Sequence, residues 1–281
     1  MILAYNTNGF AHHQLDDALA IIAGTGYGGV SITPDVHHLN PFDADLPNRL
    51  AHVREVLERC KLKCVIETGA RFLLDAHRKH QPTLISPTKE ERDYRFEFLA
   101  HNAIPMAVEL GTEVVSFWSG SATDDAGHDE FMNRLVEGCK RLSDIAASKK
   151  VRLAFEPEPG MFLDTMDKFA ELHDRVNHPS FGLTLDIGHL QCLGEMPSRP
   201  HIVKWKDKLW NIHIEDMKSG VHDHLKFGEG EIDFAEVFAS LQEIQYPGFV
   251  SVELSRHSHD AFTAAKESFV FLRSLTRWQS A

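Results

Sequence analysis

Short apolar runs rich in Val, Ile and Phe alternate with longer amphipathic stretches along the whole chain. The short runs predict eight strands, at Ile2–Tyr5, Gly29–Ile32, Cys64–Glu67, Val114–Trp118, Val151–Glu156, Gly182–Asp186, Asn211–Ile214 and Val250–Leu254. The longer stretches predict helices at Gln14–Ala23, Arg49–Arg59, Lys89–Leu110, Asp129–Ser148, Met166–Val176, Phe234–Ile244 and Asp260–Leu275. A weaker helical pattern around His201–Lys208 lies between the sixth and seventh strands. This alternation is typical of repeated βα units built on a parallel sheet.

Two parallel architectures compete for such a chain, a closed (β/α)8 barrel and an open, doubly wound sheet. The doubly wound sheet usually carries a Gly-rich turn after its first strand. Here the first turn, Asn6–Ala11, contains no GxGxxG, and the glycines of Gly24–Gly29 precede a strand instead of following one. The pattern therefore favours a (β/α)8 TIM barrel and, because no linker interrupts it, a single domain over residues 1–281.

Composition and charge narrow the classes of function. With 43% hydrophobic and 25% charged residues, the chain has ample material for a core. The formal net charge of −12 opposes the attraction that drives nucleic-acid binding, so we expect no nucleic-acid partner. The N-terminus lacks a secretory signal pattern, and no apolar stretch is long enough to span a membrane. Four scattered cysteines fit buried thiols in a reducing compartment, which predicts a cytoplasmic protein without a membrane partner.

Four late strands end on residues that can bind a metal: Glu156, Asp186, His213 and Glu253. Because the C-terminal ends of barrel strands meet at one rim, these side chains are expected to converge. Taken alone, each would more often be a capping or solvated residue, but buried carboxylates in succession require a neutralising positive charge. Three carboxylates and one imidazole favour one divalent ion, Mn²⁺ or Mg²⁺, with Co²⁺ and Zn²⁺ as alternatives.

Several motifs around these ligands resemble the xylose-isomerase-like barrels, a family that includes sugar-phosphate isomerases and epimerases and is related to endonuclease IV. The matching segments are Glu156-Pro157, Asp186-Ile187-Gly188-His189, His213-Ile214-Glu215-Asp216, His222–Asp233 and Glu253. The resemblance covers nearly the whole chain. It implies the same four metal ligands, and it implies that Glu156 and Glu253 also act as acid and base on opposite faces of the substrate.

Further polar residues beside the ligands are candidates for substrate binding. Glu158 lies two residues beyond Glu156 and would point to the same side of an extended strand, where it either binds a substrate hydroxyl or stays solvated. Positions matching His189, His222 and His224 hold additional metal ions in the endonuclease-like relatives. For this chain we expect His189 and His224 to contact the substrate or to support the metal ligands, the alternative being a second metal ion held by His189, His222 and His224.

The match to each branch of the family is incomplete. The third and fourth strands end in Glu67 and Trp118, where the endonuclease-like branch has histidines, and this argues against a three-metal nuclease centre. Ser219 stands six residues beyond His213, where the epimerases commonly carry an arginine. The identity of the substrate therefore stays open.

The loop after the third strand, Thr68–Pro87, carries a basic run that is unusual in an acidic chain: Arg71, His77, Arg78, Lys79 and His80. Loops of this kind lie on the active-site side of a barrel. Arg71 is therefore expected to bind an anionic group of the substrate, the alternative being a solvated loop. We also expect one member of the pair His12-His13 or His37-His38 to reach the pocket, and Phe10, Phe72 and Trp118 to wall it or pack the core.

The favoured chemistry is isomerisation or epimerisation of a small, carbohydrate-like keto compound. A substrate with a carbonyl beside a hydroxyl can chelate the metal, which stabilises the enediolate formed on proton abstraction. A lyase or dehydratase acting on a keto-inositol or keto-acid would need the same ligands. A zinc-dependent endonuclease is disfavoured by the missing histidines, and a non-catalytic binding barrel by the two opposed glutamates. The sequence leaves open whether identical chains assemble into a homo-oligomer.

Overall fold

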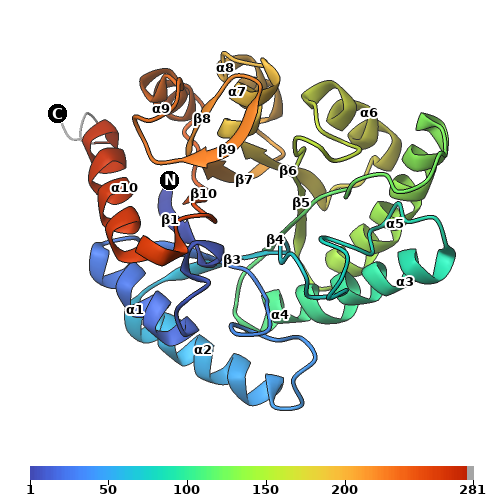
Figure 1. Ribbon diagram of the computed structural model, residues 1–281, viewed down its shortest axis with the longest axis horizontal. Coiled ribbons are helices and arrows are strands. Elements are labelled where there is room, and N and C mark those ends of the chain that lie inside the picture. The colour runs from blue at the N-terminus through green and yellow to red at the C-terminus, as the bar shows by residue number, and fades with distance from the viewer. Residues whose placement is uncertain (277–281) are drawn as a thin grey trace.

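A closed, eight-stranded parallel barrel forms the centre of the molecule in the computed structural model, which describes residues 1–276 (Figure 1). Its strands are β1 (Ile2–Asn6), β2 (Gly29–Ile32), β3 (Lys63–Glu67), β4 (Val114–Phe117), β5 (Arg152–Phe155), β6 (Phe181–Asp186), β7 (Leu209–Ile214) and β10 (Phe249–Val252). They follow one another around the barrel in chain order, and β1 closes it by pairing with both β2 and β10. The prediction of a TIM barrel is confirmed, with strand ends within a residue or two of those expected.

Helices form a ring outside the barrel (Figure 1). They are α1 (Leu15–Thr25), α2 (Leu46–Cys60), α3 (Lys89–Phe98), α4 (Ile104–Glu109), α5 (His128–Ser148), α6 (Met166–Val176), α7 (Ile187–Leu193), α8 (Arg199–Trp205), α9 (Phe234–Glu243) and α10 (Ala261–Thr276), with short 3₁₀ helices η1 (Thr7–Phe10) and η3 (Ser258–Asp260). Within residues 1–276, none of these helices has both the length and the apolar character needed to cross a membrane.

The helix expected over Lys89–Leu110 is not one regular helix. The π-helical segment η2 (Leu99–Ala103) separates α3 from α4. Pro105 lies in the first turn of α4, and because proline has no N–H it cannot donate to the carbonyl four residues earlier. A wider turn accommodates this missing bond and lets the chain continue in helical form.

A β-hairpin that the sequence pattern did not reveal follows β7 and consists of β8 (Asp216–Lys218) and β9 (Val221–Leu225). Its strands are short and largely polar, so they lack the apolar runs that predict barrel strands. Asp216 fixes the segment that follows, since its carboxylate accepts hydrogen bonds from the backbone N–H groups of Gly228 and Ile232 at 2.8 and 3.2 Å. Gly230 packs so closely on this carboxylate that a β-carbon there would lie 2.2 Å from Oδ1.

Two separate apolar clusters hold the barrel together. The large one lies between the strands and the surrounding helices and includes the fully buried rings of Phe117, Phe155 and Phe181. The small one consists of Val65, Val114 and Ala154, packed against Trp210 and Phe249. Burial of this apolar surface is the main stabilising contribution to the fold and leaves the rim of the barrel free to carry polar groups.

Candidate metal and substrate site

The four predicted metal ligands converge at one rim of the barrel. Asp186 is the last residue of β6, His213 lies near the end of β7, and Glu156 and Glu253 directly follow β5 and β10. Each offers one ligand atom, and these four atoms all lie within 4.8 Å of one another. The convergence follows from the parallel register, in which Asp186 pairs with His213 and His213 pairs with Ser251, two residues before Glu253.

His213 occupies the centre of this cluster. Its Nδ1 lies 2.9 Å from Oε1 of Glu156 and 2.9 Å from Oε2 of Glu253. Burial alone would lower the pKa of His213, but the two carboxylates overcome this effect and raise the pKa well above its ordinary value. For a carboxyl group burial acts in the opposite direction, and it raises the pKa of Glu156 to about 8. At Glu253 the positive imidazolium of His213 outweighs burial and holds the pKa well below its usual range.

The donor set fits a divalent cation. All four side chains are buried or nearly so, and Oδ2 of Asp186 is a buried oxygen without a hydrogen-bond partner among the described residues. In this arrangement the proton on Nδ1 of His213 lies between the carboxylates of Glu156 and Glu253, at N···O distances of 2.9 Å, while Nε2 of His189 lies 3.5 Å from Oδ2 of Asp186. A divalent ion would replace that proton and compensate the carboxylates more fully, and an oxygen-rich set with one imidazole suits Mn²⁺, Mg²⁺, Co²⁺ or Zn²⁺.

Two asparagines contact the ligands from outside the set. Nδ2 of Asn8 donates a hydrogen bond to Oε1 of Glu253 at 2.9 Å, which holds the second carboxylate oxygen toward His213. The amide of Asn211 lies 3.1 Å from Nε2 of His213 and is fully buried. These contacts orient a carboxylate and an imidazole that the metal would bind.

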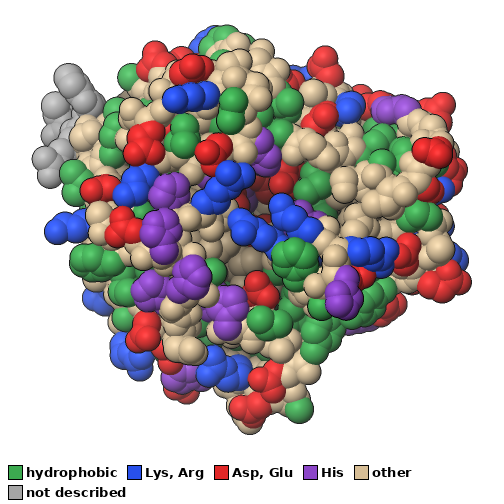
Figure 2. Space-filling view, in the orientation of Figure 1, with side chains coloured by type: hydrophobic (Ala, Val, Ile, Leu, Met, Phe, Trp, Pro, Cys, Tyr) green, Lys and Arg blue, Asp and Glu red, His purple; other side chains and the backbone are tan. Residues whose placement is uncertain are grey.

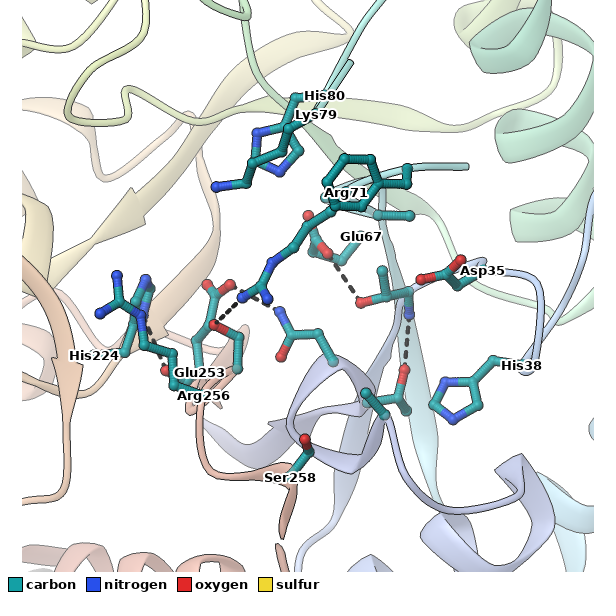
Figure 3. Close-up of a pocket in the computed structure, with 18 of the residues that line it drawn as sticks. Asp35, His38, Glu67, Arg71, Lys79, His80, His224, Glu253, Arg256 and Ser258 are labelled. Atoms are coloured by element: carbon teal, nitrogen blue, oxygen red, sulfur yellow. Dashed lines mark hydrogen bonds between the residues drawn. The ribbon is translucent and has the colours of Figure 1, made fainter. Parts of the chain in front are cut away.

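A cavity of about 550 Å³ opens above the ligands (Figure 3). Glu156 and Glu253 line it, whereas Asp186 and His213 lie deeper in the barrel. All four residues predicted to bind substrate also line this cavity: Glu158, His189, His224 and Arg71. Its size is in the range of a small-molecule site.

Three histidines form a second cluster beside the first. His189, His222 and His224 each offer a nitrogen, and these atoms lie within 4.8 Å of one another. Nδ1 of His189 contacts the carbonyl oxygen of Pro157 at 3.0 Å, and Nδ1 of His224 contacts that of Glu253 at 3.1 Å. In a neutral imidazole, donation from Nδ1 to a carbonyl leaves Nε2 as the nitrogen that can bind a ligand.

Several carboxyl groups line the inner part of the cavity, and burial and mutual repulsion raise the pKa of some of them. Burial and the neighbouring carboxylates Glu156 and Glu253 raise the pKa of Glu158 well above its ordinary value. Glu67, at the end of β3, is buried and accepts a hydrogen bond from Oγ1 of Thr33 at 3.0 Å, and burial together with Glu253 raises its pKa to about 7. The shift favours the protonated form of Glu158, which can donate a hydrogen bond as well as accept one.

The basic loop contributes only some of its charges to the cavity. Arg71, Lys79 and His80 line it. Arg78 instead forms ion pairs with Asp75 and Glu91, with N···O distances of 2.7 and 2.8 Å.

Some of the histidines and aromatic residues expected at the pocket line the cavity, and others lie outside it. Of the pairs, His12, His37 and His38 line the cavity. Among the aromatic residues, Phe72 and Trp118 wall the cavity, whereas Phe10 packs in the core against Tyr5 and His13.

Other residues of the site had no assigned role in the sequence. In the sequence, Glu67 stands where the endonuclease-like branch has a histidine, which gives it no role of its own. Asn8, Asn211, Ser255 and Arg256 belong to no recognisable motif. The loop positions of Ser255 and Arg256, directly beyond Glu253, were the one available signal, because residues after a barrel strand lie on the active-site face.

The model of one protein family, described as xylose isomerase-like TIM barrel, matches residues 6–275. The chain belongs to this family. Among curated relatives, the L-ribulose-5-phosphate 3-epimerase UlaE of Shigella flexneri serotype 5b is 26% identical over 245 residues, which cover 84% of this chain and 80% of that protein. The structure of D-allulose 3-epimerase from Methylomonas sp. in complex with D-allulose superposes with a TM-score of 0.78 at 20% identity, covering 98% of this chain and 96% of that one.

A relative with a bound metal is also similar in structure. The IOLI protein with a binding zinc atom superposes with a TM-score of 0.73 at 20% identity, over 97% of this chain and 98% of that one. At 20% identity this similarity shows a shared fold and no more than that.

Proposed function

We propose that the chain is a divalent-metal-dependent sugar epimerase that inverts the carbon beside the carbonyl of a small ketose. The observation that carries the proposal is that Glu156 and Glu253 both line the cavity while each also offers an oxygen to the same ligand set. Two carboxylates so placed give a bound substrate two groups for proton transfer, as inversion requires. The sequence similarity to a ketose-phosphate 3-epimerase supports this assignment.

Glu156, Asp186, His213 and Glu253 would hold the metal. When bound, the ion would polarise the substrate carbonyl and stabilise the enediolate formed on deprotonation. Mn²⁺ and Mg²⁺ suit the three carboxylates, and Co²⁺ and Zn²⁺ remain alternatives because of the imidazole.

The protein supplies the proton transfer and the positioning. One of the carboxylates Glu156 and Glu253 removes the proton from the carbon, and the other returns a proton from the opposite face. Glu158, His189 and His224 line the cavity beside the reacting carbon, and we expect their carboxyl group and Nε2 atoms to bind substrate hydroxyls. These contacts restrict the substrate to one orientation, which contributes to the rate because less entropy is lost at the transition state.

The experiment that tests the function follows proton exchange. Purified protein is incubated with free and phosphorylated ketoses in deuterated water, with and without a chelator, and the products are identified by NMR. The expected result is deuterium at the carbon beside the carbonyl, together with the epimeric ketose, and loss of both on chelation with recovery on adding a divalent ion. Formation of an aldose or of a dehydrated product would replace epimerase by isomerase or lyase, and no exchange with any ketose would overturn the proposal.

Asn211 gives a prediction about metal affinity. Its Oδ1 has no hydrogen-bond partner among the described residues, and turning the amide would let this oxygen accept the Nε2 proton of His213. That bond would leave Nδ1 of His213 unprotonated for the metal. Asn211→Ala is therefore expected to weaken metal binding about 10- to 100-fold, as measured by competition with a chromogenic chelator.

Asn211→Asp keeps an acceptor at the same position and should retain much of the metal affinity. Equal affinity in wild type and the alanine variant would show that Asn211 does not orient His213.

A further inference from the structure

Three cationic side chains surround the mouth of the cavity. Arg71 and Lys79 come from the loop after β3, and Arg256 comes from the loop after β10, so the charges reach the mouth from two separate loops. Figure 3 shows Arg71 and Lys79 reaching over the cavity from one side, with the guanidinium of Arg256 on the other side beside His224. In the space-filling view, Lys and Arg side chains gather around the central hollow (Figure 2), although the chain as a whole has a net charge of −12.

Two of these charges are not neutralised by the protein. Over residues 1–276, neither Arg71 nor Lys79 forms an ion pair with a carboxylate, and Arg71 only donates a hydrogen bond to Oγ of Ser255 at 3.3 Å. The neighbouring Arg78 differs because Asp75 and Glu91 compensate it. Arg256 is paired once, with Asp223 at 2.6 Å. A cationic group left without a partner at a cavity mouth is suited to an anionic ligand.

The cavity is therefore polarised from end to end. Glu67, Glu156 and Glu253 are buried or nearly so at its inner end, whereas Arg71, Lys79 and Arg256 are exposed at its mouth. Asp35 and Glu158 are the other carboxyl groups of its lining. Burial and then the positive charges of Lys79 and Arg95 lower the pKa of His80 to about 3. This shift is consistent with a positively charged mouth. His80 is thus a neutral hydrogen-bonding group within a positive region. A ligand with a neutral polyol at one end and a dianion at the other would match this gradient.

We infer that the substrate of the proposed epimerase carries a terminal phosphate, and that Arg71, Lys79 and Arg256 bind it at the mouth of the cavity. The inference rests on the proposed function for the other end of the molecule. A phosphate presents three acceptor oxygens and close to two negative charges near neutral pH. The two guanidinium groups, the ammonium, the hydroxyl of Ser255 and the imidazole of His80 provide more donors than a single carboxylate can use.

The test compares a free ketopentose, the same ketopentose as its 5-phosphate, and a keto-acid in which a carboxylate replaces the phosphate. The wild-type kcat/KM is expected to be highest for the phosphate ester. For each variant, Arg71→Ala and Lys79→Ala, we compare kcat/KM for the phosphorylated sugar with kcat/KM for the free sugar. This ratio should fall about tenfold or more, the usual cost of one lost charge-assisted hydrogen bond. The change should come chiefly from a higher KM for the phosphorylated sugar. Inorganic phosphate should compete with the ester, and more weakly in both variants.

Arg78→Gln is the matched control, because it removes a charge from the same loop at a residue that does not line the cavity. Its preference for the ester should stay within about twofold of wild type, since screening by salt and solvent limits the reach of an exposed charge.

Three results would overturn the inference: a wild-type preference for the free sugar, a preference for the carboxylate, or an equal loss on all substrates in the Arg71 and Lys79 variants. If no ketose reacts at all, the proposed function fails instead. Calorimetric binding of inorganic phosphate, measured in wild type and in Arg71→Ala, then still tests the phosphate site, and equal affinity would overturn it.

Discussion

Replacing either Glu156 or Glu253 by Gln is expected to lower turnover about a hundred- to ten-thousand-fold, the usual cost of losing a general base. Glutamine keeps an oxygen that can still contact the metal, but its amide cannot accept the substrate proton. Metal content should therefore fall less than the rate. Initial rates of epimerisation, read beside the metal content of each variant, measure the two effects separately.

The two variants should differ from one another when each epimer of the substrate is supplied alone. If the carboxylates act on opposite faces, each variant retains one intact base and exchanges the proton of only one epimer with deuterated solvent. Inversion should be lost in both. A single base that serves both faces would instead abolish exchange of both epimers in one variant and leave the other variant active.

Glu195→Gln provides the control for the substitution itself. Glu195 is a half-buried carboxylate outside the cavity, and its oxygens accept hydrogen bonds from the backbone N–H of Met166 at 3.0 and 3.3 Å. Because a Gln oxygen can accept the same bond, turnover should remain near that of wild type. Near-normal turnover in both Glu156→Gln and Glu253→Gln would rule out the proton-transfer mechanism.

The ligand cluster was predictable because it depends on strands alone. Glu156, Asp186, His213 and Glu253 end apolar runs that can be recognised in the sequence, and a parallel barrel brings the ends of such runs to one rim. For this reason a pattern of hydrophobic residues was sufficient to predict which side chains meet.

The mouth of the cavity was less predictable because it depends on the conformation of loops. Arg78 and Lys79 are adjacent in the sequence, yet one pairs with Asp75 and Glu91 while the other lines the cavity. Nothing in the local pattern distinguishes them, since loop backbones lack the fixed periodicity of strands and helices. Arg256 joins the same site from a segment far away in the chain, which only the closure of β1 on β10 brings near.

Asp186 is expected to be necessary for metal binding, and two substitutions separate this role from its structural one. Oδ1 of Asp186 caps α7 by accepting a hydrogen bond from the backbone N–H of His189 at 2.9 Å, while Oδ2 accepts no hydrogen bond from the described residues and lies 3.5 Å from Nε2 of His189. Asp186→Ala removes both functions and should cost about 0.5–2 kcal/mol for the lost cap. Asp186→Asn keeps an oxygen for the cap but removes the negative charge that a divalent cation requires.

Thermal unfolding with and without added divalent ion measures the difference. An ion present at a hundred times its dissociation constant stabilises the folded wild type by about 2.7 kcal/mol, so its melting temperature should rise. In Asp186→Asn the rise should disappear, because losing a ligand weakens binding by more than the roughly 10- to 100-fold cost of losing an outer contact.

The metal-free Asp186→Asn protein should unfold somewhat below the temperature of metal-free wild type. The imidazoles of His189 and His213 outweigh burial and lower the pKa of Asp186, so the substitution removes an attraction that favours the folded state. Asp164→Asn is the control, since Asp164 pairs with Lys168 at 2.8 Å away from the cavity and should leave the metal-dependent rise intact. If the ion stabilised Asp186→Asn as strongly as wild type, Asp186 would not be a ligand, and the cation would have to be held by the remaining carboxylates or by the histidine cluster.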